Sequence, residues 1–291
     1  MADHHPKDWY MGGNFGPEEP GRQAVIGRQD HAQRTALLTA GICSVTLRQL
    51  PTASVVATAS QAGLDGIEWG TDTHLTHDAE ARTASLLCRS RGLRVLSLGS
   101  YYRLGDFTGF DVVLSRARAA GAPRIRVWAG GKGSSEASRD DWSAVIRDAQ
   151  RVSDLAEVAG IQIALEYHGG TLTDSTISTL RLLDRVDRQN VGTYWQPPVG
   201  MDDRTALASF QELGPFLAGV HCFSWRPATE RRPLAEGLGL WQSVANTASD
   251  LGRPLDFMLE FVADDSPRNV LSDAATLNKM LSAASSGGPF G

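Results

Sequence analysis

Charged and imidazole side chains interrupt three apolar runs of the sequence. Glu166 ends the run IQIAL, His221 lies within GVHCF, and Glu260 lies within FMLEF. Packing alone favours Val, Ile or Leu there, and a buried charge is costly unless it is paired. Taken alone, His221 is typical of a core histidine that a backbone carbonyl satisfies. Taken together, two carboxylates and a neutral imidazole around one small space repel one another unless a cation lies between them. These oxygen and nitrogen ligands indicate one divalent ion, Mn²⁺, Mg²⁺ or Co²⁺, with Zn²⁺ as a further candidate.

The three residues need a scaffold that brings them together, and a regular pattern along the chain supplies one. Short apolar runs alternate with longer segments of helical spacing, such as Leu180, Leu182, Leu183 and Val186. The apolar runs fall near residues 40–45, 64–69, 93–98, 124–129, 161–167, 190–195, 217–223 and 256–262. This alternation predicts an α/β fold, a (β/α)8 TIM barrel, in which the carboxyl ends of the strands meet at one opening. A doubly wound open sheet is the competing interpretation, but it favours a glycine-rich turn after the first strand, and CSVTLRQLP has no glycine.

Length and composition predict one barrel domain flanked by two tails. Residues 37–285 carry the alternating pattern, whereas residues 1–36 and 286–291 show little periodicity and are expected to be tails. The chain has 291 residues, of which 42% are hydrophobic, so it can bury a large core. Its net charge of -5 argues against a nucleic-acid partner. No stretch approaches the roughly 18 consecutive apolar residues of a membrane span.

The cysteines indicate the compartment. Cys43, Cys88 and Cys222 are odd in number and lack metal-site spacing, which predicts a reducing compartment, taken as the cytoplasm. The first residues, MADHHPKDWYMGGNFG, contain no apolar signal segment, which agrees with that location. The N-terminal tail leaves room for a homo-oligomer in which it reaches a neighbouring subunit.

Aromatic side chains gather at the ends of the expected strands. Rings pack against the C–H faces of sugars, so an aromatic wall suits a carbohydrate or another ring, and ordinary barrel packing is the alternative. The expected substrate contacts are Glu68, Trp69, Tyr101, Tyr102, Trp128, Trp195, Trp225 and Arg226. The guanidinium of Arg226 could hold a phosphate or carboxylate, although a solvated loop is the simpler explanation.

The order of these motifs resembles the xylose-isomerase-like TIM barrel family of sugar phosphate isomerases and epimerases. The resemblance covers roughly residues 38–285 and rests on the segments AGLDGIEW, LEYHGG, GVHCFSW, PLAEGLGLWQSV and FMLEF. It implies that Glu166, His221 and Glu260 hold one divalent metal ion, completed by a residue after the sixth strand.

The resemblance departs from the family pattern at that fourth ligand. The family usually has an aspartate after the sixth strand, often with a histidine three residues later, whereas this chain has Gln196 and Val199. A glutamine ligates through its amide oxygen but brings no charge. The implied metal is therefore a stronger Lewis acid and more weakly held.

The resemblance also implies the chemistry. A metal that bridges two neighbouring sugar oxygens acidifies the hydrogen between them, because it stabilises an enediolate. Glu166 and Glu260 are implied both as ligands and as the acid–base pair. His168, two residues past Glu166, is a candidate proton shuttle, and capping of the following loop is its alternative role.

Three functions follow from the sequence. The leading one is a metal-dependent isomerase or epimerase of a sugar or cyclic polyol. The first alternative is a lyase of the same fold, either a dehydratase or an enzyme that cleaves a glycosidic or C-glycosidic bond. The second alternative is a barrel that binds a carbohydrate without catalysis. Each predicts a small carbohydrate-like partner, with neither nucleic acid nor membrane, since the DNA-repair endonuclease branch needs more histidine ligands and a DNA-binding face.

Overall fold

The computed structural model describes residues 37–226 and 229–286 and shows a closed barrel of parallel strands. The strands are β1 (Leu38–Cys43), β2 (Gly66–Gly70), β3 (Arg94–Arg103), β4 (Arg124–Trp128), β5 (Gln162–Leu165), β6 (Val191–Trp195), β7 (Leu217–Cys222) and β10 (Leu255–Leu259). Pairing of β1 with β10, from Leu38 opposite Leu255 to Ile42 opposite Leu259, closes the ring. The predicted (β/α)8 barrel is confirmed, and the doubly wound sheet is excluded.

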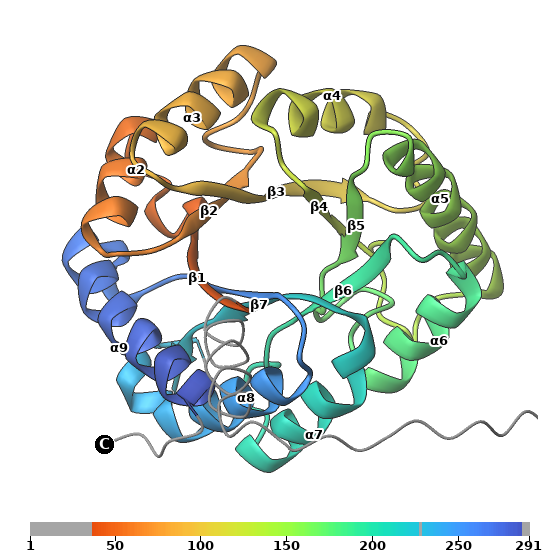
Figure 1. Ribbon diagram of the computed structural model, residues 1–291. Helices are drawn as coiled ribbons and strands as arrows, with labels where there is room; N and C mark the ends of the chain where they lie inside the picture. Colours follow the sequence, from red (N-terminus) through yellow and green to blue (C-terminus); the bar gives the residue numbers. More distant parts are fainter. Residues whose placement is uncertain (1–36, 227–228, 287–291) are drawn as a thin grey trace, which may run out of the picture.

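Helices surround the barrel and cover its outer face (Figure 1). They are α2 (Thr52–Gln61), α3 (Asp78–Ser90), α4 (Phe110–Ala120), α5 (Arg139–Glu157), α6 (Thr176–Val186), α7 (Asp203–Leu213), α8 (Leu238–Asp250) and α9 (Pro267–Ser286). Gly63 and Gly160 follow α2 and α5 with φ of 65° and 66°. This left-handed conformation ends a helix and returns the chain to the next strand.

Shorter elements decorate the loops. The 3-10 helices are η1 (Ser44–Leu47), η2 (Gly214–Phe216), η3 (Leu234–Gly237) and η4 (Ala263–Asp265). A small antiparallel hairpin follows β7 and consists of β8 (Ser224–Trp225) and β9 (Arg231–Arg232). It places Trp225 at the carboxyl end of the barrel.

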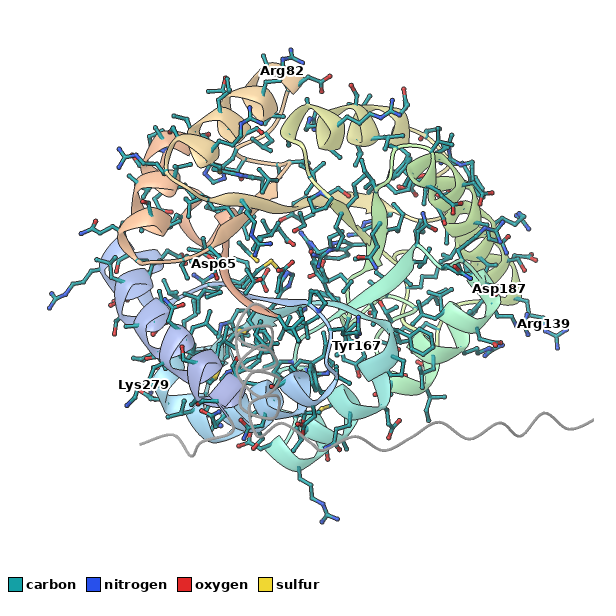
Figure 2. All side chains as sticks on the ribbon, in the orientation of Figure 1. Asp65, Arg82, Arg139, Tyr167, Asp187 and Lys279 are labelled. Atoms are coloured by element: carbon teal, nitrogen blue, oxygen red, sulfur yellow. The ribbon has the colours of Figure 1, made fainter. Side chains whose placement is uncertain are left out.

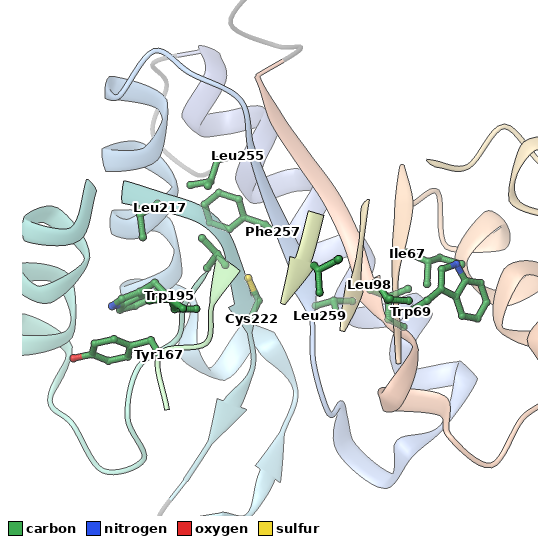
Figure 3. Packing of buried hydrophobic residues seen from close by; sticks show 14 of the residues in the cluster. Ile67, Trp69, Leu98, Tyr167, Trp195, Leu217, Cys222, Leu255, Phe257 and Leu259 are labelled. Atoms are coloured by element: carbon green, nitrogen blue, oxygen red, sulfur yellow. The ribbon is translucent and has the colours of Figure 1, made fainter. Parts of the chain in front are cut away.

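The main apolar core lies between the barrel and the helices. Ile67, Leu98 and Leu217 belong to it and pack among aromatic side chains (Figure 3). Charged side chains such as those of Arg82 and Arg139 lie on the outer rim and point away from the barrel (Figure 2). The helices therefore shield the outward strand residues, as a parallel barrel requires.

A second, smaller apolar cluster fills the middle of the barrel interior. Its members are Cys43, Val45, Leu96, Ala164, Tyr194, Ala218 and Met258. Tyr194 fits because a Cβ on Gly219 of β7 would lie only 2.5 Å from its ring. Near the amino ends of the strands, Arg124 of β4 pairs with Asp256 of β10 at 2.5 Å. The cluster thus separates this ion pair from the polar residues at the opposite end.

Several predictions concern the ends of the chain. Residues 1–36 lie outside the described part, so the N-terminal tail and its reach to a neighbouring subunit stay predictions. Helix α9 includes Ser286, so the C-terminal tail begins at least one residue later than predicted, and residues 287–291 lie outside the described part.

Within residues 37–226 and 229–286, no helix has the length and apolar character of a membrane span. All three cysteines are buried and unpaired.

Candidate metal and active site

The four residues predicted as metal ligands converge at the carboxyl ends of four adjacent strands. Glu166 follows β5, Gln196 follows β6, His221 lies near the end of β7, and Glu260 follows β10. Ligand atoms of Glu166, His221 and Glu260 lie within 4.8 Å of one another. His221 Nδ1 lies 3.0 Å from Gln196 Oε1 and 3.5 Å from Glu260 Oε2. The structure therefore brings all four side chains to one small volume.

This donor set fits one divalent ion. The ligand atoms lie close enough together to contact one ion, since those of Glu166, His221 and Glu260 lie within 4.8 Å of one another and Nδ1 of His221 lies 3.0 Å from Oε1 of Gln196. Two carboxylates, an amide oxygen and an imidazole nitrogen suit Mn²⁺, Mg²⁺ or Co²⁺. Glu166, Gln196, Glu260 and Nδ1 of His221 are the groups that would hold the ion.

Glu68 of β2 lies behind His221 and not at the mouth. Its Oε1 lies 3.4 Å from His221 Nε2, and its Oε2 accepts a 2.6 Å hydrogen bond from Ser97. Burial raises the pKa of Glu68, but His221, Arg126 and Ser97 together outweigh burial and hold that pKa well below its usual range. A carboxylate behind an imidazole favours a proton on the facing nitrogen, which leaves Nδ1 free to ligate. The structure thus corrects the expectation that Glu68 contacts the substrate, because Glu68 does not line the cavity.

Arg126 of β4 is the site residue that the sequence interpretation missed. Its Nη1 donates a hydrogen bond to Glu166 Oε2, and its Nε lies 3.2 Å from Glu68 Oε1. Burial lowers the pKa of Arg126, but Glu166, Glu68 and Glu260 outweigh burial and raise that pKa well above its ordinary value. A Cβ on Gly99 of β3 would lie 2.9 Å from Glu68 Oε1 and 3.0 Å from Arg126 Nη2. The protein itself therefore supplies one cation to the acidic cluster, and a glycine makes room for it.

Glu260 has a different environment. Among the described residues, neither an arginine nor a lysine pairs with Glu260. Burial raises the pKa of Glu260, and the charge of Glu166 raises it further, whereas His221 lowers it. Phe261, the next residue, has φ of 55°, and its N–H donates a 3.0 Å hydrogen bond to Thr46 Oγ1. This turn fixes the direction of Glu260. The two candidate catalytic carboxylates are therefore unequal, since Glu166 is engaged by a guanidinium and Glu260 is not.

A cavity of about 460 Å³ opens above the ligands. Arg126, Glu166, Gln196 and Glu260 contribute polar groups to it, as do His168 and Asp174. Of the residues expected at the mouth, those that line it are Tyr101, Trp128, His168 and Trp225. Sequence interpretation missed Phe223 and Phe261, which also line the cavity. Apolar residues in a loop give no sign of whether they face a cavity or the core.

Three aromatic side chains that were expected to contact the substrate face away from the cavity. Trp69 packs edge-on against His74, with ring centroids 5.7 Å apart, in the layer between the barrel and the helices (Figure 3). Trp195 is fully buried in the same layer. Tyr102 donates a 2.7 Å hydrogen bond from its hydroxyl to the buried Asp148 of α5. Each follows or precedes a residue that faces the interior, and successive strand side chains point to opposite faces.

Two predicted loop residues have separate outcomes. His168 reaches the cavity, where its ring lies 4.6 Å from that of Trp128, and its Nδ1 lies 2.6 Å from the carbonyl oxygen of Gly169. Because a carbonyl oxygen only accepts, Nδ1 carries the proton and Nε2 is left to exchange one. Arg226 is exposed, lies outside the cavity and pairs with Asp203 at 3.4 Å. The structure therefore does not place Arg226 at the substrate.

Comparisons with known proteins agree with this architecture. The family model described as xylose isomerase-like TIM barrel matches residues 56–280. A 3-dehydroshikimate dehydratase of Bacillus anthracis is 26% identical over 199 residues, which are 62% of this chain and 69% of that protein.

Solved structures share the fold. The D-psicose 3-epimerase of Clostridium cellulolyticum H10, determined with D-tagatose, has a TM-score of 0.57 at 16% identity and covers 84% of this chain and 96% of its own. A xylose isomerase-like TIM barrel protein of Mycobacterium smegmatis, in complex with magnesium, has a TM-score of 0.65 at 15% identity and covers 87% of this chain and 98% of its own.

Proposed function

Because this chain belongs to the xylose isomerase-like TIM barrel family, we propose that it is a metal-dependent lyase that dehydrates a hydroxylated cyclic carbonyl compound. The similarity to a dehydratase supports elimination. Dehydration and epimerisation next to a carbonyl both begin when a base removes a proton from the adjacent carbon. They differ in the second step, which is either loss of a hydroxyl group or return of a proton to the other face.

The unequal environments of Glu166 and Glu260 carry this proposal. A two-base epimerase needs two groups that exchange roles, so that one takes the proton and the other returns one. Oε2 of Glu166 already accepts a hydrogen bond from the guanidinium of Arg126, which occupies that oxygen. Glu260 meets no guanidinium, and burial raises its pKa. An elimination needs only one carboxylate that takes up and releases a proton, which favours the lyase over the epimerase.

The residues then have distinct roles. A divalent ion held by the four ligands would supply Lewis acidity to the site. Glu260 takes the proton from the carbon next to the carbonyl, and the electron pair of that C–H bond forms a C=C bond to the neighbouring carbon. The C–O bond of that neighbour breaks, and its hydroxyl leaves as water with a proton that Nε2 of His168 takes from solvent and passes on, while Glu260 returns the proton it took to solvent. Glu68 orients His221, and Arg126 holds Glu166 in place.

One experiment tests the proposed reaction. The protein is incubated with 3-dehydroshikimate in deuterated water, with Mn²⁺ or with EDTA, and NMR follows the products. We expect loss of water and an unsaturated product with Mn²⁺ only. Glu260→Gln should lower the rate by about 10²–10⁴-fold, the usual contribution of a general base. The exposed Glu236→Gln serves as the matched control. Deuterium at the carbon next to the carbonyl, without loss of water, would overturn the lyase.

Epimerisation of a sugar is the second candidate, and one observation favours it. Glu166 and Glu260 follow β5 and β10, which are separated by β6 and β7, so the two carboxylates approach the cavity from different sides. The same NMR experiment with D-psicose separates the two functions. An epimer that carries one solvent deuteron would support the epimerase.

A further inference from the structure

The first of two aromatic walls borders the cavity on one side. Tyr101 of β3 and Trp128 of β4 have ring centroids 6.2 Å apart. The ring centroid of His168 lies 4.6 Å from that of Trp128. The guanidinium of Arg103 lies 4.5 Å from the Trp128 ring and supports it. Tyr101 keeps 42% of its surface exposed, although it lines the cavity. Tyr101 thus presents the uncovered aromatic surface of this wall.

The second aromatic wall comes from the opposite side of the barrel. Phe223 and Trp225 follow β7, with ring centroids 4.7 Å apart, and Phe261 follows β10 at 5.8 Å from Trp225. The strand order around the ring places β7 across from β3 and β10 across from β4. All six side chains of the two walls line the same cavity. The cavity is therefore a slot with aromatic sides and polar groups from the barrel interior.

The volume of the slot exceeds what one small ring needs. At about 20 Å³ for each non-hydrogen atom in a close-packed organic solid, a monocyclic substrate of roughly a dozen such atoms fills about 240 Å³. The cavity measures about 460 Å³. Roughly half of it is left over, and aromatic side chains of both walls line the cavity. Empty space of this kind between rings is suited to a flat apolar group.

The charges of the cavity disfavour a phosphate in that space. Among the described residues that line the cavity there is no lysine, and the single arginine, Arg126, is already engaged by Glu68 and Glu166. Asp174 adds an acid at the edge, where it accepts hydrogen bonds from Ser134 N and Ser178 Oγ. A phosphate needs unpaired cations or free N–H groups. The charges of the lining therefore favour an uncharged group in the unfilled half of the slot.

We propose that the substrate carries a second, flat aromatic ring that lies between the two walls while its hydroxylated ring reaches the polar groups below. The chemistry at the hydroxylated ring rests on the proposed function. Recognition of the aromatic ring depends only on the walls, so binding tests it without turnover. The substrate class is thus an aryl-substituted polyhydroxylated ring, and a free monosaccharide is a poor ligand.

A matched pair of ligands tests this inference. Binding of phenyl β-D-glucopyranoside and methyl β-D-glucopyranoside to the Mn²⁺-loaded protein is measured by isothermal titration calorimetry. We expect the phenyl compound to bind about tenfold more tightly or better, because stacking and burial of one ring add to its affinity. Trp225→Leu and Trp128→Leu, one on each wall, should each remove most of that ratio. Phe216→Leu is the control, since Phe216 is 40% exposed and precedes β7 at the opposite end of the barrel.

The outcomes separate this inference from the proposed reaction. Equal affinities for the two compounds, or binding of neither at millimolar concentration, would overturn the inference. An unchanged ratio in both tryptophan variants would also overturn it, because the ring would then bind elsewhere. A protein that shows the tenfold ratio but dehydrates nothing would refute the lyase and leave the aromatic slot standing.

Discussion

Substitution of Arg126 is the most informative perturbation of this molecule. Arg126 Nε lies 3.2 Å from Glu68 Oε1, and both side chains are almost fully buried. At an effective dielectric constant of about 20, two unit charges at that distance attract by roughly 5 kcal/mol. Desolvation offsets part of this attraction, so breaking such a pair by removing one partner costs about 3–5 kcal/mol. We expect Arg126→Met to lower the free energy of unfolding by about that amount in EDTA.

A double-mutant cycle isolates the pair. Arg126→Met leaves Glu68 without its guanidinium, whereas Arg126→Met combined with Glu68→Gln removes both charges. The double variant should therefore be more stable than the sum of the single effects predicts, with a coupling of about 2–3 kcal/mol. Urea unfolding in EDTA, followed by circular dichroism, measures all four proteins. A coupling within about 0.5 kcal/mol of zero would refute the ion-pair reasoning.

Metal binding supplies a second measurement and a control. Saturation at about 100 times Kd stabilises a folded protein by about 2.7 kcal/mol. Mn²⁺ should stabilise Arg126→Met more than the parent, because the metal then replaces the missing cation. Arg124→Met is the matched control, since Arg124 is on the same strand but pairs with Asp256 beyond the central apolar cluster. Its unfolding free energy should fall without any change in the response to Mn²⁺. An equal gain for both variants would contradict this account.

Three further predictions concern stability. Burial raises the pKa of Asp273 from 3.8 to about 6. Between about pH 4 and pH 6 the folded state therefore holds a proton on Asp273 that the unfolded state has released. The free energy of unfolding falls as pH rises through this range. Asp273→Asn should abolish that fall and add about 1–2 kcal/mol at pH 7 in urea unfolding, and an unchanged slope would count against it. Gly99→Ala places a methyl group 2.9 Å from a carboxylate oxygen and 3.0 Å from a guanidinium nitrogen, so the unfolding free energy should drop by about 1–3 kcal/mol and a Mn²⁺ titration should show weaker binding. Tyr102→Phe removes a hydrogen bond to the fully buried Asp148, so it should cost about 1–3 kcal/mol in urea unfolding yet leave kcat/KM unchanged, because the ring faces away from the cavity.

The fold was predictable because its signal repeats. A parallel strand buried on both faces gives a short apolar run, and an outer helix gives a longer amphipathic segment. Polar residues at the ends of such runs, including Glu166, His221 and Glu260, have no packing explanation, so their position alone indicated a shared opening. The convergence of the ligands followed from the architecture and needed no knowledge of individual contacts.

The presence of each strand was easier to predict than which of its side chains face the barrel interior. Glu68 and Trp69 are adjacent, as are Tyr101 and Tyr102, and adjacent strand residues face opposite sides of the sheet. Both members of each pair were expected at the mouth, which the strand geometry forbids. The alternation rule could have removed one member of each pair in advance, although choosing which one requires the register between neighbouring strands.

Arg126 was missed for a related reason. The segment RIRVW alternates arginine with apolar residues, which is typical of a strand with one polar face. In a surface sheet that face is solvated, and in a barrel it lies in the interior. The partners of Arg126 come from β2 and β5, and the stagger that aligns three strands is not visible in the sequence.

The three buried cysteines can report local opening of the barrel, because a thiol reagent reaches them only when the structure around them opens. Burial raises the pKa of each thiol, so neither alkylating reagents nor mild oxidants find a thiolate while the barrel is closed. Cys43 ends β1 and Cys222 ends β7, two strands that β10 separates, and Cys88 lies on the buried face of α3. The speed at which a thiol reagent marks each position therefore maps which part of the wall gives way first, without any label being engineered into the chain.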